Sequence, residues 1–265
     1  MAFRSQVSSF VQSIPDDLWQ VPPMDQLVWL KYFKDLKPDY GFLSWLVTHF
    51  NPNTMVFRFE DSEVTSTYEE MCAVMDHHPD QDETLALPPG PRYDLAEIVA
   101  LCPVYLPDGI NMDQGLPLEP FLNRVLSADL DLPWIRACCF LLLNVYAMKN
   151  RQPGIRDFRL LTVVRDMQLY RRTVFMMIMG ETMCWVRDIA LHITDFNVHH
   201  RACSPSPQLR EQPDDITSVN KFGRSLAKSE HRAFRRRNDA GYCDTCICQL
   251  VLYPVMSRFV KVDLC

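Results

Sequence analysis

Hydrophobic side chains recur every three or four positions through most of the first 195 residues, which is typical of helices with one buried face. The stretch after Asp39 shows the pattern clearly, because Phe42, Leu43, Leu46, Val47 and Phe50 form a single apolar stripe. Prolines and polar runs separate the segments. The pattern predicts helices over 24–36, 39–50, 67–76, 94–101, 118–126, 132–149, 155–167 and 169–193.

One stretch instead alternates in the manner of a β-strand. Residues 55–59 read Met-Val-Phe-Arg-Phe, and residues 60–62 are polar and predict a turn into a returning strand at 63–65. Thr67 and Glu70 then match a capping box, in which each side chain bonds the backbone near the other, so a helix is expected to start there. We therefore predict one short β-hairpin between helices.

The segment 132–149 is apolar almost all round, which favours a position in the middle of a helical bundle. Cysteines 72, 102, 138, 139 and 184 lie inside apolar runs and are interpreted as small buried hydrophobic side chains. The predicted fold is mainly α, a multi-helix globular bundle with one short β-hairpin and a poorly structured C-terminal tail.

Charge and composition divide the chain near residue 195. Residues 1–195 carry 16 basic and 26 acidic side chains, a net charge of −10, whereas residues 196–265 carry 11 and 7, a net charge of +4. Ser204-Pro205-Ser206-Pro207 has the composition of a linker. We predict a helical body over 1–195 and a separable, mobile, basic and Cys-containing tail over 196–265, whose apolar end at 250–256 stays undocked.

Two blocks of sequence resemble a known family. The first comprises Trp45-Leu-Val-Thr-His-Phe50, the strand at 55–59, and Glu63-Val-Thr-Ser-Thr-Tyr-Glu-Glu70. The second comprises 134–150, Thr173-Val-Phe-Met-Met-Ile-Met-Gly-Glu-Thr182 and Trp185-Val-Arg187. Together they are similar to the plant mobile domain family, also called the aminotransferase-like plant mobile domain, and to its retrotransposon-associated plant relative.

The resemblance covers roughly residues 25–195 and implies a helical domain from a plant mobile element, with interactions in a nuclear or silencing-related setting. It implies no established catalytic residues. A non-enzymatic interaction domain is therefore the leading hypothesis. The alternatives are an orphan enzyme with a scattered active site, and a nucleic-acid- or zinc-binding accessory protein that acts through the tail.

The aminotransferase label raises the question of a pyridoxal phosphate enzyme, which needs a Schiff-base lysine and a phosphate-binding loop. The body has four lysines, and three of them lie on the polar side or at the end of one predicted helix. The whole chain has only eight glycines and no Gly-rich phosphate motif. We assign no catalytic residue and no cofactor. The four lysines of the body are Lys31, Lys34, Lys37 and Lys149.

Two groups of residues in the sequence could supply metal ligands. His77 and His78 precede Asp80 and Asp82, but adjacent histidines rarely face one ion, and the acidic run favours an exposed loop. Cys243 and Cys246 form a single Cys-x-x-Cys pair, whereas a zinc site needs two further ligands. No metal site is assigned, and zinc binding at the pair stays open. Other candidate ligands are His199, His200, Cys203, His231 and Cys248.

The basic run Lys221–Arg237 has seven basic residues and one acid, which suits a nuclear import signal, weak nucleic-acid binding or a solvated helix. Met176, Met177, Met179 and Met183 form a stripe that is interpreted as core filling, with a partner groove as the alternative. No run reaches the roughly 18–20 apolar residues that span a bilayer. Unidentified protein partners, no membrane, and an intracellular, more specifically nuclear, location are expected.

Overall fold

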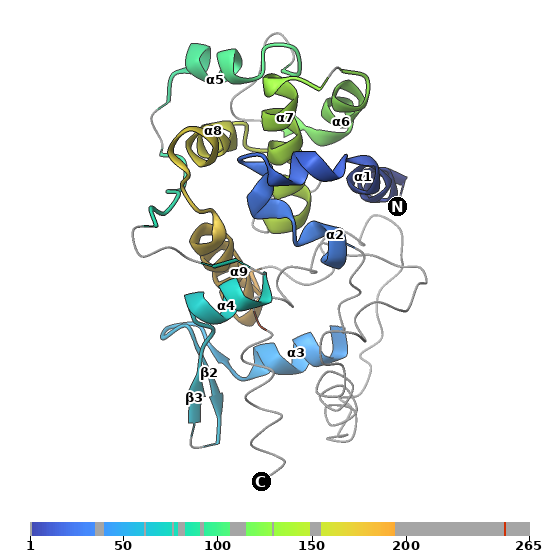
Figure 1. Cartoon of the computed structure of the whole chain (residues 1–265). Helices are drawn as coiled ribbons and strands as arrows, with labels where there is room; N and C mark the ends of the chain where they lie inside the picture. Colours follow the sequence, from blue (N-terminus) through green and yellow to red (C-terminus); the bar gives the residue numbers. More distant parts are fainter. Residues whose placement is uncertain are drawn as a thin grey trace.

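The computed structural model describes residues 2–34, 40–60, 62–75, 77–78, 83–90, 93–106, 115–128, 130–148, 155–193 and 252. Within these residues the chain is mainly helical with one small antiparallel sheet, which confirms the predicted fold class. Figure 1 shows the helices stacked above the sheet, which lies at the lower end beside α3 and α4.

The helices follow one another with short connections. They are α1 (Ala2–Ser13), α2 (Leu30–Phe33), α3 (Tyr40–Thr48), α4 (Tyr68–Val74), α5 (Leu95–Leu101), α6 (Leu118–Leu126), α7 (Leu132–Leu142), α8 (Leu160–Tyr170) and α9 (Phe175–Ala190). Two 3-10 helices, η1 (Asp16–Gln20) and η2 (Met24–Leu27), join α1 to α2, and a π-helical turn, η3 (Leu143–Ala147), extends α7.

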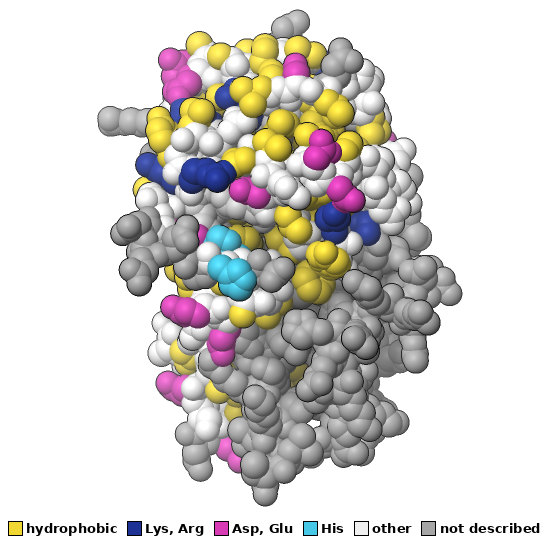
Figure 2. Space-filling view, in the orientation of Figure 1, with side chains coloured by type: hydrophobic (Ala, Val, Ile, Leu, Met, Phe, Trp, Pro, Cys, Tyr) yellow, Lys and Arg dark blue, Asp and Glu magenta, His cyan; other side chains and the backbone are white. Residues whose placement is uncertain are grey.

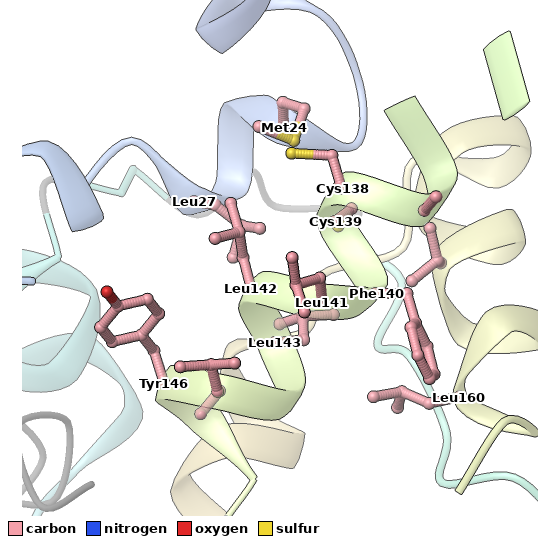
Figure 3. Packing of buried hydrophobic residues seen from close by; sticks show 14 of the residues in the cluster. Met24, Leu27, Cys138, Cys139, Phe140, Leu141, Leu142, Leu143, Tyr146 and Leu160 are labelled. Atoms are coloured by element: carbon pink, nitrogen blue, oxygen red, sulfur yellow. The ribbon is translucent and has the colours of Figure 1, made fainter. Parts of the chain in front are cut away.

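Helix α7 lies at the centre of the main hydrophobic core, as its apolar sequence predicts. Its residues from Ala137 to Leu142 are all fully buried. Figure 3 shows Met24 and Leu27 of η2 reaching one side of this helix, while Phe140 points toward Leu160 of α8 on the other. Helices α6 and α8 also contact α7, so it is covered from several directions.

Local sequence signals set where several helices begin. The capping box is present as predicted, because the Thr67 side chain accepts from the Glu70 N–H and the Glu70 carboxylate accepts from the Thr67 N–H. Asp94 caps α5 and Asp131 caps α7, each through a side-chain oxygen that accepts a backbone N–H bond.

The small sheet contains the predicted hairpin and one additional strand. Strands β2 (Val56–Phe59) and β3 (Ser62–Val64) pair antiparallel, with Arg58 opposite Glu63. Strand β1 (Phe50–Asn51) pairs with the other edge of β2. Two residues at 116–117 form β4, which pairs with Ile155–Arg156 of β5.

A second, smaller hydrophobic cluster lies where α3, the sheet and the C-terminal half of α9 meet. Helix α9 links the two cores, because Phe175 and Ile178 belong to the main core whereas Val186 and Ile189 belong to the second. Leu252 is also buried in the second cluster. Leu252 belongs to the apolar end of the tail, which was predicted to stay undocked. The structure instead packs this residue against the body.

No helix was expected over α1, and four of the expected helices differ from those observed. The segment 24–36 divides into η2 and α2, and the segment 132–149 changes to a π turn at Leu143. Residues Ile155–Arg156 form a strand, so α8 begins at Leu160. The run 169–193 is interrupted because Arg171 adopts a left-handed conformation that closes the end of α8.

None of the helices in the described part of the chain has the length and the apolar content required to cross a membrane. Helix α9 buries one face in both cores.

Candidate functional site

The break between α8 and α9 gathers polar side chains from distant parts of the sequence. Segment 171–174 leaves α8 at the left-handed Arg171 and enters α9 at Phe175. Thr173 in this break is 1% exposed, although it lies between two helices. We call Tyr68, His77, Glu83 and Thr173, which meet here, the junction cluster.

Backbone and amide hydrogen bonds hold the break in place. Gln26 of η2 donates its side-chain N–H to the Arg172 carbonyl at 2.9 Å and accepts from the Val174 N–H at 2.9 Å. Thr173 pairs with the segment 84–86, because its N–H donates to the Thr84 carbonyl at 2.9 Å and its carbonyl accepts from the Ala86 N–H at 2.8 Å. These bonds join three segments that are remote in sequence.

Glu83 is the centre of the junction cluster. One carboxylate oxygen accepts a hydrogen bond from the Tyr68 hydroxyl at 2.6 Å, and the other accepts one from Nε2 of His77 at 2.6 Å. The Tyr68 hydroxyl also lies 3.4 Å from the Thr173 hydroxyl. The imidazole of His77 packs against the ring of Phe175, with ring centroids 4.5 Å apart. The cluster therefore connects α4, the segment 83–86 and the start of α9.

The chemistry of the cluster is that of a hydrogen-bonded clasp. Burial and the bond to Glu83 raise the pKa of Tyr68 above its ordinary value of 10.0, so the phenol stays protonated and acts as a donor. A carboxylate that orients an imidazole also occurs in acid–base sites. In this cluster the carboxylate is shared with a phenol, and both bonds tie chain segments together.

The cluster corrects the expectation for His77, which is half-buried and bonded to Glu83 rather than part of a solvated loop. His78 next to it is exposed, as expected. Asp80 and Asp82 lie outside the described residues. Among the residues that are described, no three His, Cys, Asp or Glu side chains converge as metal ligands. Sequence reasoning missed Tyr68, Glu83 and Thr173, since Tyr68 and Thr173 are 105 positions apart.

The lysines weighed for pyridoxal phosphate do not converge where they are described. Lys31 forms an ion pair with Asp16, and Lys34 is buried near the end of α2. Lys37 and Lys149 lie outside the described residues. The same holds for Cys243, Cys246, their possible partner ligands and the basic run Lys221–Arg237, so the zinc and nucleic-acid hypotheses stay predictions.

The cysteines and the methionine stripe lie mainly in the cores. Cysteines 72, 102, 138 and 139 are buried and unpaired by disulfides, which confirms their interpretation as small buried side chains, while Cys184 is half-buried. Burial raises the pKa of Cys102 to about 12. Met177 and Met183 fill the main and the second core respectively, as a core-filling stripe predicts.

A shallow cleft of about 200 Å³ lies between α5 and α8. It is smaller than the roughly 300–1,000 Å³ typical of small-molecule sites. Its two arginines already have acidic partners: Arg159 bonds Asp157 at 2.6 Å, and Arg165 bonds Asp166 at 2.8 Å as well as Glu97. Among the described residues that line the cleft, no positive charge is left uncompensated for an anion.

An exposed apolar patch lies at the opposite end of the bundle from the sheet. The turn after α5 crosses this end, because Cys102 Sγ lies 3.8 Å from the Pro133 carbonyl and Arg124 donates to the Tyr105 carbonyl at 3.2 Å. Figure 2 shows hydrophobic side chains gathered over this end, where α5 and α6 lie. The leucine patch comprises Val104 (65% exposed), Leu126 (51%), Leu130 (60%) and Leu132 (52%).

Asp25 provides a test of the electrostatics beside the junction cluster. Burial raises the pKa of this carboxyl above its ordinary value of 3.8, although the Gln26 N–H and Arg171 act in the opposite direction. The folded protein therefore binds the proton more tightly than the unfolded chain. The carboxyl favours folding most below pH 3.8, and this contribution is lost as the pH rises through the folded pKa.

Replacing this charge should stabilise the protein at neutral pH only. We expect Asp25→Asn to raise the urea midpoint at pH 7 and to leave it unchanged at pH 3, measured by circular dichroism. The variant keeps the oxygen that accepts the Gln26 N–H at 2.9 Å. Asp16→Asn, at a carboxyl whose side chain is almost fully exposed, is the control. A lower midpoint for Asp25→Asn at pH 7 would show that attraction to Arg171 outweighs burial.

Comparison with known proteins finds no match among family models, curated proteins or solved structures. The resemblance to the plant mobile domain therefore stays a prediction based on the two sequence blocks.

Proposed function

We propose that this chain is a non-enzymatic protein-interaction domain, derived from a plant mobile element and acting in the nucleus, and that the leucine patch is its binding surface. The observation that carries the binding role is the exposure of four large apolar side chains at one end of the bundle. The similarity of two sequence blocks to the plant mobile domain supports the origin and the setting.

Exposed hydrophobic side chains on a soluble protein are usually scattered singly, whereas grouped ones mark surfaces that bind other proteins. Two of the four patch residues lie at helix ends that pack against each other, and Val104 and Leu130 lie in the turns beside them. Leu126 ends α6 and Leu132 begins α7, and the Trp134 indole donates to the Val125 carbonyl at 3.0 Å between them. A rigid apolar surface loses little conformational entropy when a partner binds.

The partner that fits this surface is a segment with an apolar face and basic flanks. Residues 1–195 carry a net charge of −10, and Asp131 lies within the patch between Leu130 and Leu132. Two copies of so acidic a body repel each other, which disfavours self-association through the patch. A basic partner is instead attracted before the apolar contacts form.

The alternative of an enzyme with a scattered active site has its best support in the junction cluster. His77 there is bonded to a carboxylate and remains 23% exposed. However, the same carboxylate bonds Tyr68, and the surrounding bonds connect the ends of helices. A structural clasp accounts for all of these contacts, so the interaction domain is the better-supported function.

The test compares partners captured from plant nuclei by two variants of the full chain. In the patch variant Leu126, Leu130 and Leu132 become Ser; in the control variant Leu87, Leu169 and Leu191, which are similarly exposed elsewhere, become Ser. We expect one or more proteins, identified by mass spectrometry, to bind wild type and control but not the patch variant. All three proteins should have circular dichroism melting curves within a few degrees of one another.

The captured protein is then titrated in purified form. Loss of three central apolar contacts should weaken its binding by about 100-fold or more, since each central interface residue can contribute well over tenfold. Equal binding to the patch variant and to the control variant would contradict a binding role of the leucine patch.

A further inference from the structure

The second hydrophobic cluster contains one residue from far outside the body. Leu252 is 1% exposed, and it lies in the same cluster as residues of α3, β2 and α9. All other described members of this cluster come from residues 42–190. Leu252 is 59 positions beyond the next described residue, Ile193, so its burial is a long-range contact.

We propose that the surface formed by α3, the sheet and the C-terminal half of α9 is a docking site for the chain's own C-terminal segment, and that Leu252 is the anchor. The cluster has far fewer buried members than the main core, so the loss of one affects it more. Phe42, Leu46 and Phe57 form its α3 and strand sides, and Val186 forms its α9 side. All four are less than 10% exposed with Leu252 in place.

The charges of the two parts favour the same docking. The tail carries +4 and the body −10, so the two attract at low salt. This attraction between net charges does not determine where on the body the tail binds, and salt screens it within about 10 Å at ordinary ionic strength. A fully buried leucine does select a position, because its burial requires a matching apolar surface. Docking is therefore specified by Leu252 and assisted by charge.

The first experiment measures amide hydrogen exchange by mass spectrometry on the full chain and on Leu252→Ala. We expect α3 and β2 to exchange faster by on the order of 30-fold or more, which corresponds to the usual effect of truncating a buried leucine. Helices α7 and α8 of the main core should exchange as in wild type. The control Leu191→Ala, at an exposed leucine just after α9, should change the exchange rates of neither group of elements. Unchanged exchange in α3 and β2 would overturn the proposal.

The second experiment tests docking when the covalent connection is cut. A specific protease site is inserted between Pro205 and Ser206 of the full chain, and after cleavage the fragments are separated by size exclusion at 1 M NaCl. We expect the fragment with Leu252 to stay with the body in high salt, and to be lost from it in Leu252→Asp but not in Leu191→Asp. A fragment that separates from the wild-type body, or one retained equally by all three proteins, would overturn the anchor.

Discussion

Phe140→Ala should lower the free energy of unfolding by about 3–5 kcal/mol, the usual cost of removing a buried aromatic ring. Phe140 is fully buried at the centre of α7. Its ring meets that of Phe121 edge to face, with centroids 5.2 Å apart, and its other side faces Leu160 of α8 (Figure 3). The cavity would lie between three helices that are fixed by other contacts, so it cannot close easily. Urea unfolding followed by circular dichroism measures the change.

Leu132→Ala on the same helix is the matched control. Leu132 is 52% exposed at the first turn of α7 and belongs to the leucine patch. Its loss should change the free energy of unfolding by no more than about 0.5 kcal/mol, as is usual for surface substitutions. Similar costs for the two variants would mean that α7 does not lie in the middle of the bundle.

The parts of the fold that could be predicted from sequence are those with local causes. Helix α6 begins at Leu118 and ends at Leu126, as its apolar periodicity indicates. The capping box at Thr67 and Glu70 fixed the start of α4, because both partners lie within one turn. The hairpin of β2 and β3 followed from alternation and a polar turn. In each case the signal and its partner are separated by only a few residues.

The parts that could not be predicted depend on partners far along the chain. Ile155–Arg156 read as the start of a helix, but it pairs with β4 some 40 positions earlier. Arg156 is buried and donates to the Asn144 carbonyl at 3.2 Å, in the π turn that ends α7. Neither the strand pairing nor the bond to Asn144 can be recognised from the spacing of nearby residues. Tertiary contacts here override the local helix propensity.

The candidate sites show the same limit. The leucine patch could not be recognised from sequence, because Leu122 and Leu126 lie on one helix and only the first is buried. The junction cluster left a single signal, a histidine followed by acidic residues, which equally suits a solvated loop. The break between α8 and α9 brings its actual partners together. This break depends on Arg171 adopting a left-handed conformation.

Glu83→Ala should cost about 2–3 kcal/mol of unfolding free energy, because it leaves two partners in a half-buried site without their acceptor. The carboxylate accepts from Tyr68 and from His77, each at 2.6 Å, and its side chain is only 12% exposed. Tyr68→Phe removes one of the two bonds and should cost less. The double variant should cost less than the two single changes combined, because the shared bond is lost only once.

Glu63→Ala separates the effect of burial from that of pairing. Glu63 also accepts a bond from a basic side chain, Arg58 at 2.7 Å, but its side chain is 54% exposed. An exposed pair of this kind contributes roughly 0–1 kcal/mol, since water screens the charges and ordering two long side chains has an entropic cost. We therefore expect urea unfolding to show a much larger loss for Glu83→Ala than for Glu63→Ala. Equal losses would mean that the junction cluster does not hold α4, the segment 83–86 and α9 together.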